Sequence, residues 1–379
     1  MSGEKHADPW QGLAEAETVA DKLRFMHGVM KDHMPHITRI AVALYDPDTD
    51  YLRTFVYSSL EDSPLTHYQA KLADCLSLQE IAASGEPRVV NDLSVFNRHG
   101  DEHQHTKAIY DAGLRSSYTL PMVWEGHFLG FVFFNGDEPE VFSERVLTEL
   151  DVIAHMITLL IFNERTNVRV LLATIKSALD LTHSRDPETG GHLERMSRYS
   201  QLIAKNIAEL KGLDDQYVEH ILLFSPLHDL GKLAIPDSIL LKDGPLDAEE
   251  REIMRTHSEQ GRSLIDKLLK NYGLNGVTHV DMLRNIALHH HEAWDGTGYP
   301  DRLVGNTIPL EARIVAVADV FDALTSRRPY KEAWSNSEAF AKLKEMAGEK
   351  LDAECVAALI NDKAQIEEIQ HVFKENPYG

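Results

Sequence analysis

Apolar and polar residues in the first 160 positions alternate as they do in a partly buried sheet. Two runs rich in β-branched and aromatic residues, 37–45 and 51–58, are separated by the turn-forming sequence DPDTD. A second pair, 116–124 and 128–135, is joined by a short Glu-Gly turn and is the clearest hairpin in the chain. The stretch 88–90 is also expected to be extended. These runs predict an antiparallel sheet.

Helices are predicted on either side of these strands. One covers 12–35, where apolar residues recur every three to four positions, and a short one covers 77–83 before the sequence GEP. The order of helices and strands predicts an α/β/α sandwich. The segments SLQEIAASGEPRVVNDL and LPMVWEGHFLGFVFFN resemble a GAF domain over residues 11–160. This resemblance implies a sensor module that binds an unidentified small ligand or mediates dimerisation.

A long helix is predicted to follow the sheet from about Ser143. Its apolar residues are spaced alternately three and four positions apart, with Glu164 as the one break in the series, which favours a parallel two-stranded coiled coil. They are Leu147, Leu150, Ala154, Ile157, Ile161, Val168, Leu171, Ile175 and Ala178. We therefore expect a connecting helix over 143–183 that joins two copies of the chain as a homodimer. The alternative is a helix that packs on its own domain.

The remainder of the chain shows helical spacing and no convincing alternation. Helices are expected at 190–211, 214–230, 247–270, 279–291, 309–325, 335–346 and 352–361. Residues 184–379 should therefore form a separate all-helical domain, so that the fold class of the whole chain is α+β.

The charge balance narrows the possible partners. The 379 residues include 60 acidic side chains and 38 Lys or Arg side chains, a formal net charge of −22. This balance argues against a protein that coats nucleic acid or docks on an anionic membrane, since both kinds of binding rely on Lys and Arg. Cys75 and Cys355 encode neither a disulfide framework nor a CxxC zinc site. The start lacks a signal core, and the apolar runs are shorter than the about 20 residues that cross a bilayer, so a cytoplasmic location is expected.

Histidine is frequent, with 20 residues, many of them in the C-terminal half. Five segments there combine histidine or carboxylate side chains: PETGGHLERM, SPLHDLGK, MRTHSEQG, HHHEAWDG and VAVADVFDA. Imidazole and carboxylate together suit iron, manganese or zinc, whereas Ca²⁺ and Mg²⁺ prefer oxygen ligands. A single histidine on a helix is more commonly a surface or core residue. Five histidines and three carboxylates in one helical half indicate a metal site, provided that the five segments converge.

Two motifs, HDLGK at 228–232 and GTGYP at 296–300, resemble those of the HD-GYP family of cyclic dinucleotide phosphodiesterases. The order and spacing of six sequence blocks agree with this family. The resemblance implies a clustered metal site with eight ligands: Glu188, His192, His228, Asp229, His257, His290, His291 and Asp319. It also implies that members with the glutamate at the position of Glu188 hold three metals and that members without it hold two. We therefore expect a trinuclear iron site, with a binuclear site or manganese as alternatives.

The same resemblance implies a substrate and the residues that act on it. Cyclic di-GMP would be hydrolysed to linear pGpG, with further hydrolysis to GMP left open. Metals lower the pKa of bound water and so supply a nucleophile at neutral pH. Asp229 would bridge the metals, and Lys232 would bind the scissile phosphate. Substrate contacts are expected from Gly298, Tyr299, Arg328 and Lys331.

Alternatives to this function remain open. The substrate could be a hybrid cyclic GMP-AMP, because the sequence does not place the groups that select a purine. The protein could also be a cyclic di-GMP receptor that acts through protein contacts. Ala293 stands where the family usually has an arginine. This difference puts in doubt an ion pair or loop contact near the site, but it affects none of the expected metal ligands. In each case we expect the GAF-like domain to regulate the helical domain through the connecting helix.

Overall fold

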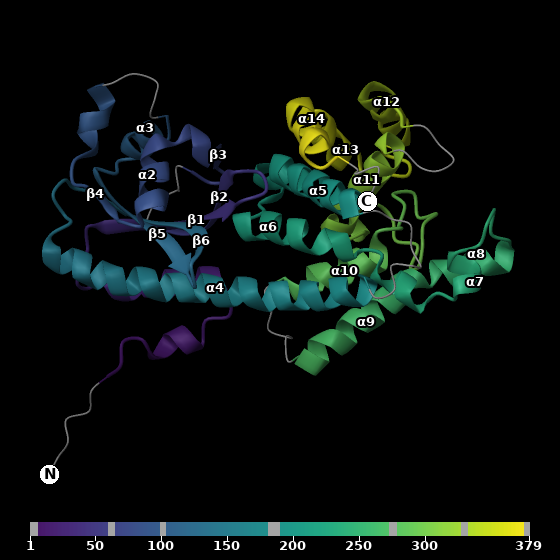
Figure 1. The fold of residues 1–379 in the computed structure, drawn as a ribbon, viewed down its shortest axis with the longest axis horizontal. Helices are drawn as coiled ribbons and strands as arrows, with labels where there is room; N and C mark the ends of the chain where they lie inside the picture. Colours follow the sequence, from purple (N-terminus) through teal and green to yellow (C-terminus); the bar gives the residue numbers. More distant parts are fainter. Residues whose placement is uncertain are drawn as a thin grey trace, which may run out of the picture. The chain divides into compact units, whose positions relative to one another are not determined.

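The structure divides into two compact units. A computed structural model describes residues 7–59, 65–98, 104–180, 190–272, 279–326 and 333–374. Unit 1 comprises Met1–Thr166 and unit 2 comprises Asn167–Gly379 (Figure 1). Each unit has its own hydrophobic core, as expected for separate domains, and each is described by itself.

Unit 1 is built on a six-stranded sheet. Its strands are β1 (Ile37–Asp46), β2 (Tyr51–Ser59), β3 (Gln69–Lys71), β4 (Arg88–Val90), β5 (Ser116–Trp124) and β6 (His127–Gly136). They lie in the order β3-β2-β1-β6-β5-β4, and every neighbouring pair is antiparallel. In the predicted hairpin of β5 and β6, Glu125 and Gly126 have φ angles of 50° and 79°, as a tight primed turn requires. The predicted antiparallel sheet is confirmed.

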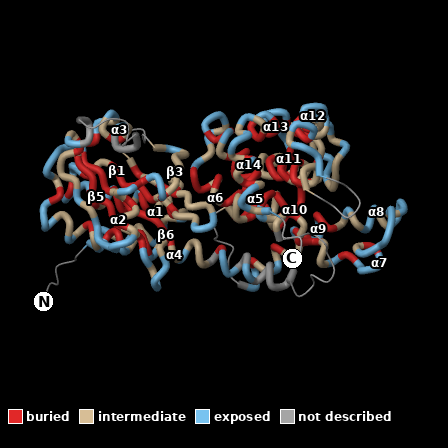
Figure 2. The backbone as a smooth tube through the Cα atoms, turned by 45° about the horizontal axis from the view of Figure 1, so that its top comes forward, coloured by how far each residue is buried: buried red, intermediate tan, exposed pale blue. Residues whose placement is uncertain are grey.

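Helices cover both faces of this sheet. They are α1 (Val19–Lys31), α2 (Leu76–Ser84), α3 (Gln104–Asp111) and α4 (Glu144–Asp180), with 3₁₀ turns η1 (Gln11–Ala14), η2 (Leu72–Asp74) and η3 (Leu93–Arg98). α1 and α4 share one hydrophobic core with the sheet, and α2 forms another with Leu52 and Phe131. The strands β1, β5 and β6 between these layers are mostly buried (Figure 2). The predicted α/β/α sandwich is therefore confirmed.

The helix predicted over 12–35 is shorter than expected. α1 begins only at Val19, because Thr18 and Asp21 form a capping box. The Thr18 hydroxyl accepts a hydrogen bond from the Asp21 N–H at 3.0 Å, and the Asp21 carboxylate accepts one from the Thr18 N–H at 3.2 Å. This exchange satisfies two N–H groups that a helix start otherwise leaves unpaired.

The long helix α4 places part of its predicted heptad seam inside unit 1. Leu150, Ala154, Ile157 and Ile161 are at most 3% exposed and belong to the core between the helix and the sheet. These positions pack on their own domain, as the alternative interpretation predicts, and are not open to a second chain. The seam positions Leu171, Ile175 and Ala178 have side chains outside the described residues.

One stretch of α4, Glu144–Val170, is long and apolar enough by length and composition to cross a membrane. It contains no uninterrupted apolar run of that length, because charged residues are spread thinly along it. Of its most apolar window, 33% is buried. Its buried face packs on the sheet of unit 1.

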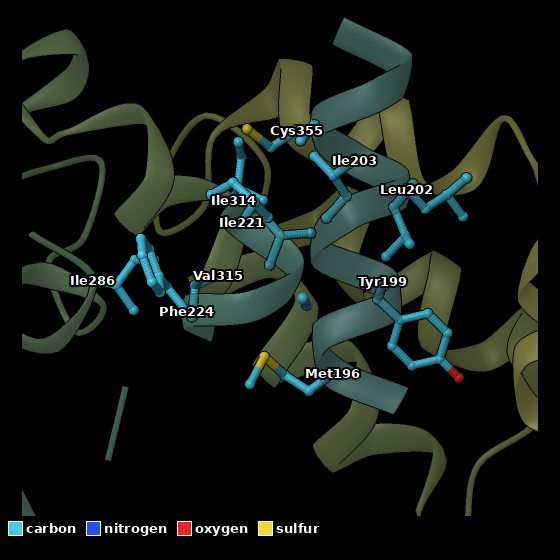
Figure 3. Packing of buried hydrophobic residues seen from close by; sticks show 14 of the residues in the cluster. Met196, Tyr199, Leu202, Ile203, Ile221, Phe224, Ile286, Ile314, Val315 and Cys355 are labelled. Carbon is cyan, nitrogen blue, oxygen red and sulfur yellow. The ribbon is translucent and has the colours of Figure 1, made fainter. Parts of the chain in front are cut away.

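Unit 2 is helical. Its described residues include isolated β-bridges but no β-strand. Its helices are α5 (Gly190–Lys211), α6 (Asp215–Phe224), α7 (Asp237–Leu240), α8 (Ala248–Arg255), α9 (His257–Tyr272), α10 (Val280–His289), α11 (Leu310–Thr325), α12 (Asn336–Met346), α13 (Ala353–Ile360) and α14 (Lys363–Val372), with 3₁₀ turns η5 (Ser225–Leu227), η6 (Leu230–Ala234) and η7 (Gly305–Thr307). Figure 3 shows Tyr199 and Ile203 of α5 in the core that this helix shares with Ile221 of α6 and Ile314 of α11. The predicted all-helical second half is confirmed.

Two of the predicted helices are interrupted. The helix expected at 214–230 ends at the C-terminus of α6 and continues as the 3₁₀ turns η5 and η6, since Pro226 has no N–H to extend the α-helical hydrogen bonding. The helix expected at 247–270 breaks at Thr256, whose hydroxyl donates to the carbonyl oxygen of Ile253 at 2.7 Å. The final helix α14 was not predicted.

Candidate metal centre

Four of the predicted ligands lie together in unit 2. Asp229, His257, His290 and His291 offer one ligand atom each, and these atoms all lie within 4.8 Å of one another. Asp229 precedes η6, His257 begins α9, and the two remaining histidines follow α10. Three segments far apart in the sequence therefore converge on the Asp229 carboxylate.

A second group adjoins the first. His192 of α5, His228 at the end of η5 and Asp319 of α11 also place their ligand atoms within 4.8 Å of one another. His228 links the groups, since its Nε2 is 3.1 Å from Oδ2 of Asp229. Seven of the eight predicted ligands are thus brought together, whereas Glu188 lies outside the described residues.

The histidine rings of this cluster are oriented by backbone carbonyl groups. The Nδ1 atom of His228 donates to Ser225 at 3.0 Å, that of His257 to Met254 at 2.7 Å, and that of His290 to Ile286 at 2.9 Å; the three acceptors are carbonyl oxygens. A proton on Nδ1 leaves the lone pair of a neutral imidazole on Nε2. Ligand histidines in metalloproteins show this same pattern of second hydrogen bonds.

The atoms that face one another in the cluster are all suited to accept a cation. Nε2 of His257 lies 3.4 Å from Nε2 of His290 and 3.2 Å from Oδ1 of Asp229. Within the described part of the chain, this buried carboxylate oxygen receives no hydrogen bond of good geometry. Buried acceptors that face only other acceptors are costly unless a cation lies between them. The donor set of nitrogen and carboxylate oxygen fits a divalent transition metal.

Electrostatics favours the protonation states that bind metal. Burial disfavours ionisation of Asp229, but the positive charges of His228 in its protonated form and of Lys232 outweigh burial and hold the pKa of this carboxyl well below its usual range. Burial lowers the pKa of His290, and burial together with His290 lowers that of His291. An ionised carboxylate and neutral imidazoles are the ligand forms that metal binding requires.

A buried aspartate that the sequence analysis missed supports this cluster. Asp322 is 0% exposed and accepts a hydrogen bond from Nδ1 of His192 at 2.8 Å. Arg195 holds the same carboxylate through two further hydrogen bonds of 2.7 and 3.0 Å. Burial raises the pKa of Asp322, but the hydrogen bonds from His192 and Arg195 outweigh it and lower that pKa. The sequence signal was the spacing of Asp322 three residues after Asp319, on one side of a helix.

We expect the substitution Asp322→Asn to weaken metal binding about 10- to 100-fold, as loss of a partner that orients a ligand does. An asparagine oxygen accepts a weaker hydrogen bond from His192 than a carboxylate does, so the ring is held less firmly. Calorimetric titration of metal-free protein with Mn²⁺ measures this. The control Asp281→Asn removes an exposed carboxylate that forms an ion pair with Arg284 at 2.8 Å. Equal affinities for both variants would contradict the role of Asp322.

The GTGYP loop, residues 296–300, packs directly on the histidine segment. A Cβ atom at Gly298 would lie 2.3 Å from the backbone nitrogen of Ala293 and 2.5 Å from the carbonyl oxygen of His291, so only glycine allows this approach. The ring of Tyr299 lies over that of His291, with centroids 4.8 Å apart. Burial and the charge of Asp229 raise the pKa of Tyr299, which keeps its hydroxyl protonated. Two predicted substrate contacts therefore lie beside the cluster.

The remaining predicted positions differ in what can be said of them. Nζ of Lys232 forms an ion pair with Oδ2 of Asp229 at 2.9 Å, one turn along η6. Its place at the cluster agrees with the motif spacing, while its role toward phosphate stays a prediction. Arg328 and Lys331 lie outside the described residues. Ala293 occupies a position where an arginine is usual in the family, and its backbone nitrogen packs closely against Gly298.

Comparison with known proteins identifies the fold of this helical unit. Residues 179–355 match the family described as HD domain. The chain is 49% identical over 185 residues to the cyclic di-GMP phosphodiesterase response regulator RpfG of Xanthomonas campestris, covering 49% of this chain and 46% of that protein. It is 36% identical over 246 residues to the 3'3'-cGAMP-specific phosphodiesterase 2 of Vibrio cholerae, covering 61% of this chain and 45% of that protein. The chain thus spans less than half the length of these two relatives.

Unit 1 has its own counterpart among solved structures. The GAF domain of an Acinetobacter phosphoenolpyruvate-protein phosphotransferase aligns with 42% of this chain and 90% of its own, with 16% sequence identity and a TM-score of 0.33.

Proposed function

We propose that this chain, whose residues 179–355 match the HD domain family, is a metal-dependent phosphodiesterase that hydrolyses cyclic di-GMP to pGpG. The observation that carries this proposal is the convergence of five histidines, Asp229 and Asp319 in two adjoining groups of potential ligands. Two relatives named as cyclic di-GMP phosphodiesterases are 49% identical to this chain over 185 residues and 39% identical over 205 residues. GMP as a final product remains an extension of this proposal.

The residues of the site have separate tasks in such a reaction. The two ligand groups would hold the metals, which supply a nucleophile at neutral pH and neutralise charge on the phosphate. Asp229 lies between the groups and would bridge them, with Lys232 as its charged neighbour. Lys232 would bind a phosphate oxygen of the substrate. Tyr299 would contact the ligand from the GTGYP loop, and Arg328 and Lys331 would add positive charge.

The metal is proposed to be iron in a trinuclear arrangement. Glu188 lies four residues before His192, so it would reach the second ligand group if the helical spacing extends to it. We expect Glu188→Gln to lower the metal content from about three to about two ions per chain, because an amide is a poorer ligand than a carboxylate. Elemental analysis of anaerobically purified protein measures this, with Glu194→Gln on α5 as the control. Three ions in the Glu188→Gln variant would contradict the assignment of Glu188 as a ligand. Manganese instead of iron in the unaltered protein would show that the metal is manganese.

The choice of substrate between two cyclic dinucleotides is a separate proposal. Relatives of this chain include proteins named as specific for 3'3'-cGAMP, with 36% and 29% identity. The relative with 49% identity is named for cyclic di-GMP, which favours that substrate. Parallel assays with both substrates decide the question. Binding without turnover of either would favour the receptor function.

Unit 1 is proposed to bind a small ligand in a cavity of about 60 Å³ between β1, β2 and the region of α2. Its walls are mostly apolar, with Arg39, Thr54, Tyr68 and Cys75 as the polar exceptions. Burial lowers the pKa of Arg39 to about 10, so its guanidinium remains charged at neutral pH. A small ligand with an acceptor group suits such a wall.

Filling this cavity should alter phosphodiesterase turnover at least about twofold if unit 1 regulates unit 2. Ala43→Leu adds about three methyl-sized groups to the cavity wall and excludes a ligand by volume. Ala73→Leu is the matched control, because Ala73 is exposed. Turnover should be measured in cell extract and with purified protein. If both variants and the unaltered chain then show the same turnover, regulation through the cavity is ruled out.

A homodimer through α4 and a cytoplasmic location complete the proposal. Val152 and Leu159 are 59% and 40% exposed on α4 and are seven residues apart, as on one stripe of a coiled coil. This outward stripe, and not the buried seam, is the surface that a second copy would use. Sedimentation of Leu159→Glu should then show monomers. The acidic chain is not expected to bind polymeric nucleic acid or an anionic membrane.

A further inference from the structure

A third group of potential ligands lies beside the GTGYP loop and uses none of the residues described so far as ligands. It consists of His289, Glu292 and Asp301, whose ligand atoms lie within 4.8 Å of one another. His289 ends α10, and Asp301 directly follows the loop. We propose that this group is a separate site for one divalent transition metal ion, which fastens the loop to the end of α10.

The histidine of this group points an acceptor into the site. His289 is 8% exposed, and within the described residues its buried Nδ1 makes no hydrogen bond. Nδ1 lies 3.8 Å from Oε1 of Glu292 and 3.8 Å from Oδ2 of Asp301. These distances are too long for hydrogen bonds. They are short enough for one shared ion, since two donors on zinc can be up to about 4.2 Å apart.

The site is distinct from the main cluster although His289 and His290 are consecutive. Successive residues on a helix project about 100° apart, so the two rings leave α10 in different directions. The His290 ring faces Asp229, and the His289 ring faces Asp301. An ion bound between His289 and Asp301 would therefore be separate from those of the phosphodiesterase centre.

The carboxylate of Glu292 is already fixed in place. Its side chain is 0% exposed and accepts the backbone N–H groups of Asp301 at 2.8 Å and of Leu303 at 3.0 Å. Each oxygen keeps a second lone pair for an ion. Asp301 is 56% exposed, so its side chain can approach an ion without repacking. The positive charge of Arg262 is near His289 and opposes a cation there, but the two carboxylates outweigh it in formal charge.

The donor set indicates the chemical class of the ion. One imidazole and two carboxylates with room for water match Zn²⁺ or Mn²⁺, whereas Ca²⁺ would require more oxygen ligands. Because Glu292 holds the backbone of the segment after the loop, an ion here would order the loop that carries Tyr299.

Crystals of the full chain grown with Zn²⁺ test the site directly. We expect an anomalous difference peak about 2 Å from Nδ1 of His289 and from a carboxylate oxygen of Asp301, separate from peaks at Asp229. Asp301→Asn should lose this peak and bind one Zn²⁺ fewer per chain by elemental analysis. The control Glu349→Gln changes an exposed carboxylate and should bind as many ions as the unaltered protein.

A second variant separates this site from the main one. Asp229→Asn removes the carboxylate between the main ligand groups, so the ion at His289 should remain and should be lost only when Asp301→Asn is added. No peak at His289, or an equal metal count with and without Asp301→Asn, would overturn the proposal. Neither result depends on phosphodiesterase activity, so failure of the proposed function would leave this test intact.

Discussion

Asp229→Asn should lower kcat/KM for cyclic di-GMP by about 1,000-fold or more. The loss corresponds to about 4 kcal/mol of transition-state stabilisation, the scale expected when metals no longer activate water and neutralise phosphate charge. Asp229 is the residue at which both ligand groups meet, with Nε2 atoms of His228 and His257 at 3.1 and 3.2 Å. An amide keeps the shape of the side chain but lacks the negative charge with which Asp229 would hold divalent cations.

Two further measurements distinguish loss of metal from loss of the fold in this variant. Metal content should fall in parallel with activity, while circular dichroism and the melting temperature of metal-free protein stay close to those of the unaltered chain. Asp266→Asn serves as the control, since this carboxylate on α9 is 45% exposed and pairs with Arg284 at 2.7 Å. Its activity should remain within about twofold, as surface ion pairs contribute little. Full activity of Asp229→Asn would refute the metal mechanism.

Gly231→Ala should both destabilise unit 2 and disturb the site. A Cβ atom at Gly231 would lie 1.7 Å from the carbonyl oxygen of His257 and 2.5 Å from the backbone nitrogen of Gly261, so α9 must move away from η6. We expect a loss of about 3 kcal/mol in the free energy of unfolding, the upper end for an overpacked core. Displacement of His257 by about 1 Å should cost about 100-fold in activity.

Urea unfolding measures the loss of stability, and assays of phosphodiesterase activity and metal content on the folded protein measure the disturbance of the site. Gly28→Ala is the matched control, because a Cβ atom there meets no atom within 4 Å in helix α1. It should stabilise unit 1 by up to about 1 kcal/mol through helix propensity. If Gly231→Ala unfolds at the same urea concentration as the unaltered chain and retains its metals, the close contact between η6 and α9 is wrong.

The spacing of apolar residues predicted most of the architecture but not every use of a helix face. Alternation located β5 and β6 to within about two residues, because their turn and their burial pattern agree. The stripe through Leu150 and Ile157 was ambiguous, since an apolar helix face looks the same whether a sheet or a second helix covers it. Only the structure assigns this face to unit 1.

The candidate site was likewise predicted only in part from the sequence. The motifs identified seven positions that the fold brings together, because spacing along a chain marks chemistry even when the path between segments is unknown. The role of Asp322 could not be predicted, because a carboxylate in an apolar helix commonly forms a structural ion pair. Asp322 does form such an ion pair, with Arg195. The breaks before His257 and around Pro226 depend on local hydrogen bonds that helical periodicity does not report.

Hydrolysis of cyclic di-GMP by the purified full chain, loaded anaerobically with Fe(II), tests the central claim most directly. Chromatography of the products should show pGpG appearing as cyclic di-GMP disappears, at a rate that a chelator abolishes and that added Fe(II) or Mn(II) restores. Intact cyclic di-GMP after incubation with each metal, from protein that retains its metals and its fold, would contradict a phosphodiesterase function for this centre.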